Sequence, residues 1–317
     1  MHPASAAKLF PRAPRAGQED SIPDCGTDTC MKLQINPAHS APPFTIPQCR
    51  GKKLRGEKIV CLTVYDHPSA RLLDQAGVDI ALVGDSLGMA LGGYDSTLPV
   101  TLEEMILATR WVRRGLERAL LVTDLPYGSY QLGWRQTVRS GLKLVRRGGA
   151  AAVKLEGGGR RVRLVEALVE AEIPVMGHLG LTPQALHRMG GYKVQALDAA
   201  SAEALLADAR ALEAAGAFAL VLEGVPRELA GAVTRALQIP TIGIGAGPDC
   251  DGQILVWHDV LGLSPGPAPR FVRAYADLKA VIAPALSAYA REVRAGTFPA
   301  DAESYHRPPA QRLAAAH

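Results

Sequence analysis

The sequence predicts an α/β protein that folds as a single (β/α)8 barrel of the TIM type, preceded by a disordered N-terminal extension. Short apolar runs without polar alternation recur between residues 59 and 256, as is typical of parallel strands buried on both faces. Helical periodicities lie between these runs without a break in composition, which favours a closed barrel. An open, doubly wound sheet of the Rossmann type is the alternative.

Eight apolar runs are predicted to be strands, which is the number that a barrel of this type requires. In chain order they are Ile59–Val64, Ile80–Val83, Ala119–Thr123, Ala151–Leu155, Ile173–Met176, Ala217–Leu222, Thr241–Ile244 and Ile254–Val256.

Helices are predicted between the strands, most clearly in the segments that begin at Thr101 and Ser201. Thr101 and Glu104 have the spacing of a capping box, and apolar residues follow at helical period as far as residue 116. Ser201 is the predicted N-cap of a helix that continues to residue 215. Further helices are expected over residues 68–76, 134–147, 160–171, 226–237 and 270–295.

The two ends of the chain differ from its middle. Residues 1–46 are rich in proline and show no sustained period, so we expect a disordered or loosely attached extension. The catalytic barrel is expected over residues 47–306, and residues 307–317 form a short tail. The 317 residues therefore contain one domain, because α/β barrels of about 250 residues fold as a single unit.

Composition excludes several classes of protein. A net charge of +4 and 5% aromatic residues argue against a nucleic-acid partner. No apolar run approaches the about 20 residues that span a membrane, and the N-terminus lacks a signal core. The five cysteines have no regular spacing, so we expect reduced thiols and a cytoplasmic location. Cys25 and Cys30 lack a second Cys or His pair, so a metal knuckle is disfavoured.

Polar residues follow the predicted strands, at the barrel rim where active sites assemble. In order they are Asp66, Asp85 with Ser86, Asp124, Lys154 with Glu156, His178 and Glu223. A single Asp after a strand is usually a turn residue or a helix cap. Six strand ends in succession make independent capping less credible than one shared site.

The same rim predicts a magnesium site. Lys154 and Glu156 lie two positions apart in one strand and so face the barrel interior together, as a structural ion pair or as part of a site. Asp85, Asp124 and Glu156 offer hard oxygen ligands, which suit Mg²⁺. With Mg²⁺ present, the charges of these carboxylates and Lys154 cancel. Such a site can accept a small 2-oxo acid, whose ketone the metal polarises.

Proton removal beside a ketone requires a base. Glu223 lies in an apolar stretch that should raise the pKa of its carboxyl group, and it is the candidate. His178 is the competitor, although a lone histidine at a strand end more often supports a site by hydrogen bonding.

The remaining glycine-rich and arginine-rich segments give weaker predictions. The loops Ser86–Val100 and Leu179–Gln195 are long enough to act as lids over the rim. The run from Gly243 to Gly247 departs from a dinucleotide fingerprint and favours a close approach of the backbone to a ligand. Three pairs of arginines are interpreted as solvated helix faces: Arg113/Arg114, Arg146/Arg147 and Arg160/Arg161.

Several ordered runs between Pro47 and His306 carry a specific resemblance. They closely resemble the 3-methyl-2-oxobutanoate hydroxymethyltransferase family, also called ketopantoate hydroxymethyltransferase. The runs are V-G-D-S-L-G-M (83–89), G-Y-D-S-T-L-P-V-T (93–101), D-L-P (124–126), V-K-L-E-G-G (153–158), G-H-L-G-L-T-P-Q (177–184), G-G-Y-K-V-Q (190–195), L-E-G-V-P (222–226) and I-G-I-G-A-G-x-x-C-D-G-Q (242–253).

The resemblance implies a cytoplasmic, Mg²⁺-dependent barrel enzyme of pantothenate biosynthesis. Such enzymes transfer a hydroxymethyl group from 5,10-methylenetetrahydrofolate to 3-methyl-2-oxobutanoate, through an enolate that Mg²⁺ stabilises, and give 2-dehydropantoate. It also implies a homo-oligomer, a decamer in this family. Nothing in the residue pattern itself points to the folate.

The resemblance also implies a role for each matched residue. Asp85, Asp124 and Glu156 would be at the metal. Asp85, Ser86, Asp124 and Lys154 would bind the oxo acid, and Glu223 would accept the proton, with His178 in support. Two positions depart from the family pattern, namely Pro267 where a histidine is common nearby and His67 where an aromatic residue is common.

Two other functions remain open. A related Mg²⁺-dependent lyase that breaks a C–C or P–C bond of another 2-oxo acid would share the barrel, but neither long rim loop carries the reactive cysteine usual in such enzymes. A non-catalytic metabolite-binding barrel would be expected to have lost at least one of the site residues, and none is lost.

Overall fold

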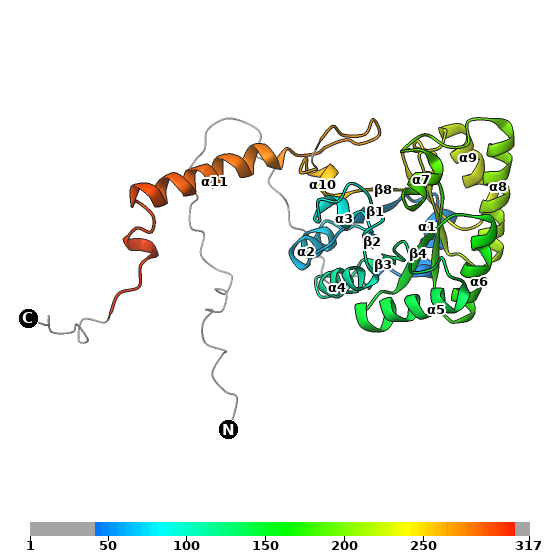
Figure 1. Ribbon diagram of the computed structural model, residues 1–317, viewed down its shortest axis with the longest axis horizontal. Helices are drawn as coiled ribbons and strands as arrows, with labels where there is room; N and C mark the ends of the chain where they lie inside the picture. Colours follow the sequence, from blue (N-terminus) through cyan, green and yellow to red (C-terminus); the bar gives the residue numbers. More distant parts are fainter. Residues whose placement is uncertain (1–41, 265, 308–317) are drawn as a thin grey trace, which may run out of the picture. The chain divides into compact units, whose positions relative to one another are not determined.

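The structure is a computed structural model that describes residues 42–264 and 266–307 (Figure 1). Its eight strands are all parallel to their neighbours and close into a barrel in chain order, which confirms the predicted barrel and excludes the open Rossmann-type sheet. The expected disorder of residues 1–41 lies outside the described residues. The strands are β1 (Ile59–Thr63), β2 (Ile80–Val83), β3 (Leu120–Asp124), β4 (Ala152–Glu156), β5 (Val175–Gly180), β6 (Ala219–Glu223), β7 (Thr241–Ile244) and β8 (Gly252–Leu255).

Helices connect the strands and surround them, as the labelled ribbon shows for α4, α5, α6 and α8 (Figure 1). Among the described residues, no helix is long and apolar enough to cross a membrane. The helices are α1 (Ile46–Leu54), α2 (His67–Gln75), α3 (Leu87–Ala90), α4 (Leu102–Arg113), α5 (Trp134–Lys143), α6 (Val162–Glu170), α7 (Leu186–Met189), α8 (Ala199–Ala214), α9 (Arg227–Ala236), α10 (Trp257–Val260) and α11 (Leu278–Ala295).

Helix starts follow the local chemistry of their first residues. The capping box of α4 is confirmed, because Thr101 Oγ1 accepts from the Glu104 N–H at 3.2 Å and Glu104 Oε2 accepts from the Thr101 N–H at 2.7 Å. The predicted cap of α8 is wrong: Asp198, three residues before Ser201, accepts the Ser201 N–H at 2.9 Å. Asp198 is a favoured N-cap residue and its negative charge lies at the N-terminal end of the helix dipole, so the helix begins at Ala199.

Other helices also differ from the sequence-based expectation, because the short helices α3, α7 and α10 were not predicted. The helix predicted over residues 270–295 begins only at Leu278, where Asp277 is its N-cap. Helix α1 was not predicted, and it begins after Thr45 within the last residues of the proline-rich segment. The Phe44 N–H donates to the Arg118 carbonyl at 2.7 Å, which joins this segment to the barrel.

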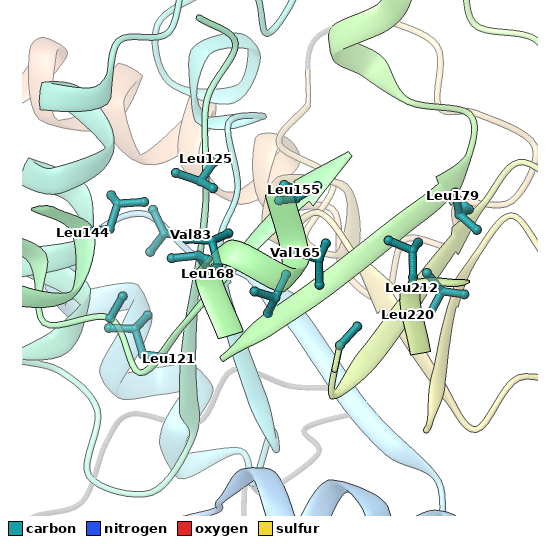
Figure 2. Packing of buried hydrophobic residues seen from close by; sticks show 14 of the residues in the cluster. Val83, Leu121, Leu125, Leu144, Leu155, Val165, Leu168, Leu179, Leu212 and Leu220 are labelled. Carbon is teal, nitrogen blue, oxygen red and sulfur yellow. The ribbon is translucent and has the colours of Figure 1, made fainter. Parts of the chain in front are cut away.

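The core has two layers, one on each face of the strands. The interior layer consists of side chains such as Ile59, Val122 and Met176, which fill the barrel. The outer layer lies between the strands and the helices, and Figure 2 shows Leu212 of α8 beside Leu220 of β6 within it. Because successive residues of a strand point to opposite faces, these two layers account for the absence of polar alternation.

The same alternation places polar side chains inside the barrel above the apolar layer. In β4, Ala152 belongs to the interior layer, and Val153 and Leu155 belong to the outer one. Lys154 and Glu156 therefore point inward with Ala152, as their spacing predicted. In β3, Leu120 and Val122 face inward, which directs Asp124 to the same side.

One buried carboxylate ties a helix to the segment that leads into β3. Asp74 in α2 is 8% exposed, and its two oxygens accept the N–H groups of Glu117, Arg118 and Ala119 at 2.7–3.2 Å. These amides precede Leu120 and have no strand partner of their own to satisfy them. Asp74 thus fixes the position at which β3 begins.

We expect Asp74→Ala to lower the free energy of unfolding by about 3 kcal/mol, because it leaves three amide donors without their charged acceptor. For a chain of this size the loss corresponds to a fall in Tm of about 4–6 °C. Circular dichroism during heating measures the change. The control is Asp95→Ala at an exposed position, for which we expect a shift in Tm within about 2 °C. Equal Tm values for the two variants would contradict this role of Asp74.

Candidate active site

Seven predicted site residues lie at the carboxyl ends of five consecutive strands, β2 to β6. Five of them are almost fully buried, with exposed fractions of 2–5%: Asp85, Asp124, Lys154, Glu156 and His178. Ser86 and Glu223 are partly buried. Asp66, which also follows a strand, is instead the cap of α2 and accepts the Ser69 N–H at 2.8 Å. Asp66 is therefore a helix cap, and the other seven residues form one cluster.

Lys154 lies at the centre of this cluster. Its Nζ is 2.9 Å from Asp124 Oδ1 and 3.3 Å from His178 Nδ1. Burial alone would lower the pKa of Lys154, but the carboxylates of Asp124, Glu156 and Asp85 outweigh burial and raise it. Lys154 is therefore a permanent cation inside the barrel.

The carboxylates around Lys154 outnumber it. Burial, followed by the charge of Asp124, raises the pKa of Asp85 to about 7. Burial also raises the pKa of Glu156 well above its ordinary value, against the lowering effect of Lys154. One ammonium group cannot compensate three ionised carboxylates, so without a further cation Asp85 and Glu156 hold their protons more strongly than usual. A bound cation would favour their ionised forms.

Gln184 connects the carboxylates, and sequence reasoning did not single it out. Its side-chain Nε2 donates to Asp85 Oδ2 at 2.7 Å and to the Leu125 carbonyl at 3.0 Å. Its backbone N–H donates to Glu156 Oε2 at 3.0 Å, and its Oε1 accepts from the Tyr130 hydroxyl at 2.6 Å. Gln184 ends the G-H-L-G-L-T-P-Q run, which is the only sequence signal that it carries.

His178 joins the lysine to the candidate base. Its Nε2 lies 3.2 Å from Glu223 Oε2, and its Nδ1 faces Lys154. Burial and the Lys154 charge lower the pKa of His178, so the imidazole is neutral near pH 7. Because an ammonium group only donates, Nδ1 is assigned as the acceptor and the ring proton as lying on Nε2. Nε2 is close to Glu223 but makes no hydrogen bond of good geometry to it.

Glu223 has a more polar setting than its sequence neighbours suggested. Its side chain is 15% exposed and has His178 beside it. Gly180 of β5, which pairs with Glu223 across the ladder, has a φ of +92°, and a Cβ there would lie 2.2 Å from the Glu223 carbonyl oxygen. Glycine at residue 180 therefore permits the backbone position of Glu223.

Ser86 is held by a chain of hydroxyl groups. The Tyr65 hydroxyl lies 2.9 Å from Ser86 Oγ and accepts from Thr63 Oγ1 at 2.8 Å. Gly84 precedes the pair Asp85 and Ser86, and the Asp85 N–H donates to Asp124 Oδ2 at 3.1 Å. The β2 end is thereby tied to the β3 end.

The acidic residues fit Mg²⁺ by their chemistry. Asp124 Oδ1 has the Lys154 charge beside it but accepts no hydrogen bond of good geometry, so a buried oxygen is free for a ligand. Among residues 42–264 and 266–307, no three His, Cys, Asp or Glu side chains are already grouped as a metal cage. Mg²⁺ does not require one, because it commonly takes one or two carboxylates and completes its shell with water and substrate oxygens.

The glycine run after β7 packs against the chain itself. A Cβ at Gly245 would lie 2.8 Å from the ring of Phe271, and one at Gly247 would lie 2.4 Å from Arg227 Cβ. These neighbouring side chains and the left-handed φ values of +60° and +78° require glycine at residues 245 and 247. The expected approach of this backbone to a ligand stays a prediction.

Solved structures of other enzymes share this fold. A 2,3-dimethylmalate lyase, described as a member of the PEP mutase/isocitrate lyase superfamily, superposes with a TM-score of 0.52 at 21% identity, over 82% of this chain and 91% of the other. A phosphonopyruvate hydrolase in complex with oxalate and Mg²⁺ gives a TM-score of 0.52 at 15% identity, over 83% and 92%. At these identities the likeness concerns the fold.

Relatives of known name are much more similar in sequence. The 3-methyl-2-oxobutanoate hydroxymethyltransferase of Koribacter versatilis is 53% identical over 81% of this chain and 87% of its own. The enzyme of the same name from Geotalea daltonii is 54% identical over 83% and 98%. A family model described as ketopantoate hydroxymethyltransferase matches residues 43–301. With most of its length and its whole barrel covered, this chain belongs to the ketopantoate hydroxymethyltransferase family.

Proposed function

We propose that this chain transfers a one-carbon unit from 5,10-methylenetetrahydrofolate to 3-methyl-2-oxobutanoate in pantothenate biosynthesis. C3 of the oxo acid forms a bond to the methylene carbon, the bonds from that carbon to the two folate nitrogens break, and one water supplies the hydroxyl group. The products are 2-dehydropantoate and tetrahydrofolate.

One observation supports this reaction above all. The same rim holds a base, Glu223, a fixed cation, Lys154, and a group of buried carboxylates around Asp85. Proton removal beside a ketone needs a base, and an anionic substrate needs a cation to bind it. The members of the family named above have the matching activity in their names.

Glu223 would take the proton from C3 of the oxo acid. The neutral His178 holds its Nε2 3.2 Å from Glu223 Oε2, a position from which it would orient the carboxylate without neutralising it. Lys154 has three N–H donors, two of which face Asp124 and His178, and the third would bind the oxo acid. Asp85, Ser86 and Asp124 would line the same substrate position.

Asp85 and Asp124, together with Glu156, would hold Mg²⁺. When bound, the metal supplies Lewis acidity that polarises the ketone and makes the adjacent proton easier to remove. The hydrogen bonds of Gln184 to Asp85 and Glu156 keep these carboxylates apart and oriented.

We expect Glu223→Gln to stop the exchange of the C3 proton of 3-methyl-2-oxobutanoate with D₂O in the presence of Mg²⁺. The amide keeps the shape of the side chain but accepts no proton. Proton NMR measures the exchange without any folate. Glu228→Gln, an exposed change on α9, is the matched control and should exchange at the wild-type rate. If Glu223→Gln exchanged the proton at the full wild-type rate, Glu223 would not be the base, and His178 would be the next candidate.

A chelator should abolish folate-dependent formation of 2-dehydropantoate, and added Mg²⁺ should restore it. The buried carboxylates would otherwise lack the cation that their charge requires. Product analysis by mass spectrometry in four arms, with and without chelator and with and without the folate, measures this. Turnover of the oxo acid without folate would instead favour a lyase of the type that shares the fold.

We also propose a cytoplasmic homo-oligomer. Helix α11 has 18 residues and none of them is buried, although Val281, Leu286 and Tyr289 are 57–64% exposed. An apolar surface of this kind is typical of a face that another subunit covers.

Light scattering coupled to gel filtration should therefore give a mass of at least twice the 33.6 kDa of one chain. Replacing Leu286 with Glu would place a charge on the same helix face and should lower that mass. A wild-type monomer would contradict the oligomer.

A further inference from the structure

A cavity of about 830 Å³ opens beside the candidate active site and remains outside the roles assigned above. Its lining includes Glu156 and Gln184, which belong to the site, and continues past Gly157–Gly159 to Arg160 and Arg161. The pair Arg160 and Arg161 was expected to form a solvated helix face. In the structure these arginines line a cavity that also includes Glu156 and Gln184 of the candidate site.

The cavity is cationic at its outer part. Arg160, Arg161 and Arg188 line it, and within the described part of the chain no carboxylate lies within ion-pair distance of any of them. Asp208 also lines the cavity, but its Oδ1 accepts the Gly159 N–H at 2.8 Å. Guanidinium groups without carboxylate partners are suited to bind carboxylates in pairs.

The cavity also offers aromatic surface between the arginines and the site. Tyr127 is 48% exposed and lines the cavity together with Tyr130. The Arg161 guanidinium lies 5.1 Å from the centre of the Tyr130 ring, and the Tyr130 hydroxyl donates to Gln184. A ligand with a flat ring next to the site and carboxylates beyond it would match this order.

We propose that Arg160, Arg161 and Arg188 bind the glutamate carboxylates of the folate donor, with its p-aminobenzoyl ring beside Tyr127. The inference rests on the proposed function, because the donor consists of a reactive pterin, an aromatic ring and a glutamate in that order. The carboxylates would then anchor the donor and hold its methylene carbon over the oxo acid. The 2-oxo acid is too small to need this cavity, so its binding does not depend on the three arginines.

The test compares two donors and three forms of the protein. The donors are 5,10-methylenetetrahydrofolate and 5,10-methylenetetrahydropteroate, which lacks the glutamate. The forms are the wild type, the double variant Arg160→Gln/Arg188→Gln, and the control Arg163→Gln, an exposed arginine of α6 that does not line the cavity. The readouts are the KM for each donor and the rate of C3 exchange without folate.

We expect the double variant to raise the KM for the glutamate-bearing donor about tenfold, since each exposed ion pair contributes only a few-fold. Its KM for the pteroate donor, its KM for the oxo acid and its C3 exchange should stay at wild-type values. Arg163→Gln should match the wild type throughout. The wild type itself should bind the pteroate donor about as weakly as the double variant binds the complete donor.

Three outcomes would overturn the proposal. Equal wild-type KM values for the two donors would show that no glutamate site exists, although product still forms. A rise in the KM of the double variant for both donors would indicate a general loss of structure or charge. Absence of folate-dependent product in the wild type would contradict the proposed function and this inference together, and intact C3 exchange would separate that case from a misfolded protein.

Discussion

The burial of one ammonium group among three carboxylates dominates the carboxyl end of this barrel. Lys154 is 5% exposed and faces Asp124 directly, with Asp85 and Glu156 close enough to raise its pKa. An uncompensated charge in this position would cost several kcal/mol. The hydrogen bonds of Gln184 to Asp85 and Glu156 and the position of His178 against Lys154 satisfy parts of this charge cluster. The pKa values of Asp85 and Glu156 are nevertheless raised, chiefly by burial and against the lowering effect of Lys154.

The interior of the barrel has an apolar part and a polar part, and the charged groups all lie in the polar part. Apolar side chains such as Val122 and Met176 fill its lower part, and the polar cluster lies above them on the same inward-facing positions. The strand ladders hold partners in fixed register, with Asp124 opposite Lys154 and Glu156 opposite His178. Asp124, Lys154, Glu156, His178 and Glu223 therefore stand on strands, whereas Asp85, Ser86 and Gln184 reach the site from the segments that follow β2 and β5.

The strands were predictable because burial on both faces removes polar alternation, and the pair Lys154 and Glu156 was predictable because strand periodicity is two. Gln184 was not, because its place depends on how the segment after β5 folds back over the rim. Helix α1 was missed because its capping by Thr45 lies within a proline-rich stretch that suggested no structure. The position of Arg160 beside a cavity was not predicted either, because paired arginines usually face water and the sequence does not show which helix ends border a cavity.

The ring of strands closes where β8 meets β1, opposite the strands that carry the charged groups. The inward-facing residues of β1, β7 and β8 are uncharged and include Ile59, Ile242 and Ile254. Substitution at these positions is limited by volume and packing alone. At the inward-facing carboxyl ends of β2 to β6, substitution is limited by charge. Replacing one charged residue there with a neutral one changes the electrostatic environment of all its charged neighbours. Among relatives, we therefore expect the inward-facing residues of β1, β7 and β8 to be replaced more often than those at the carboxyl ends of β2 to β6.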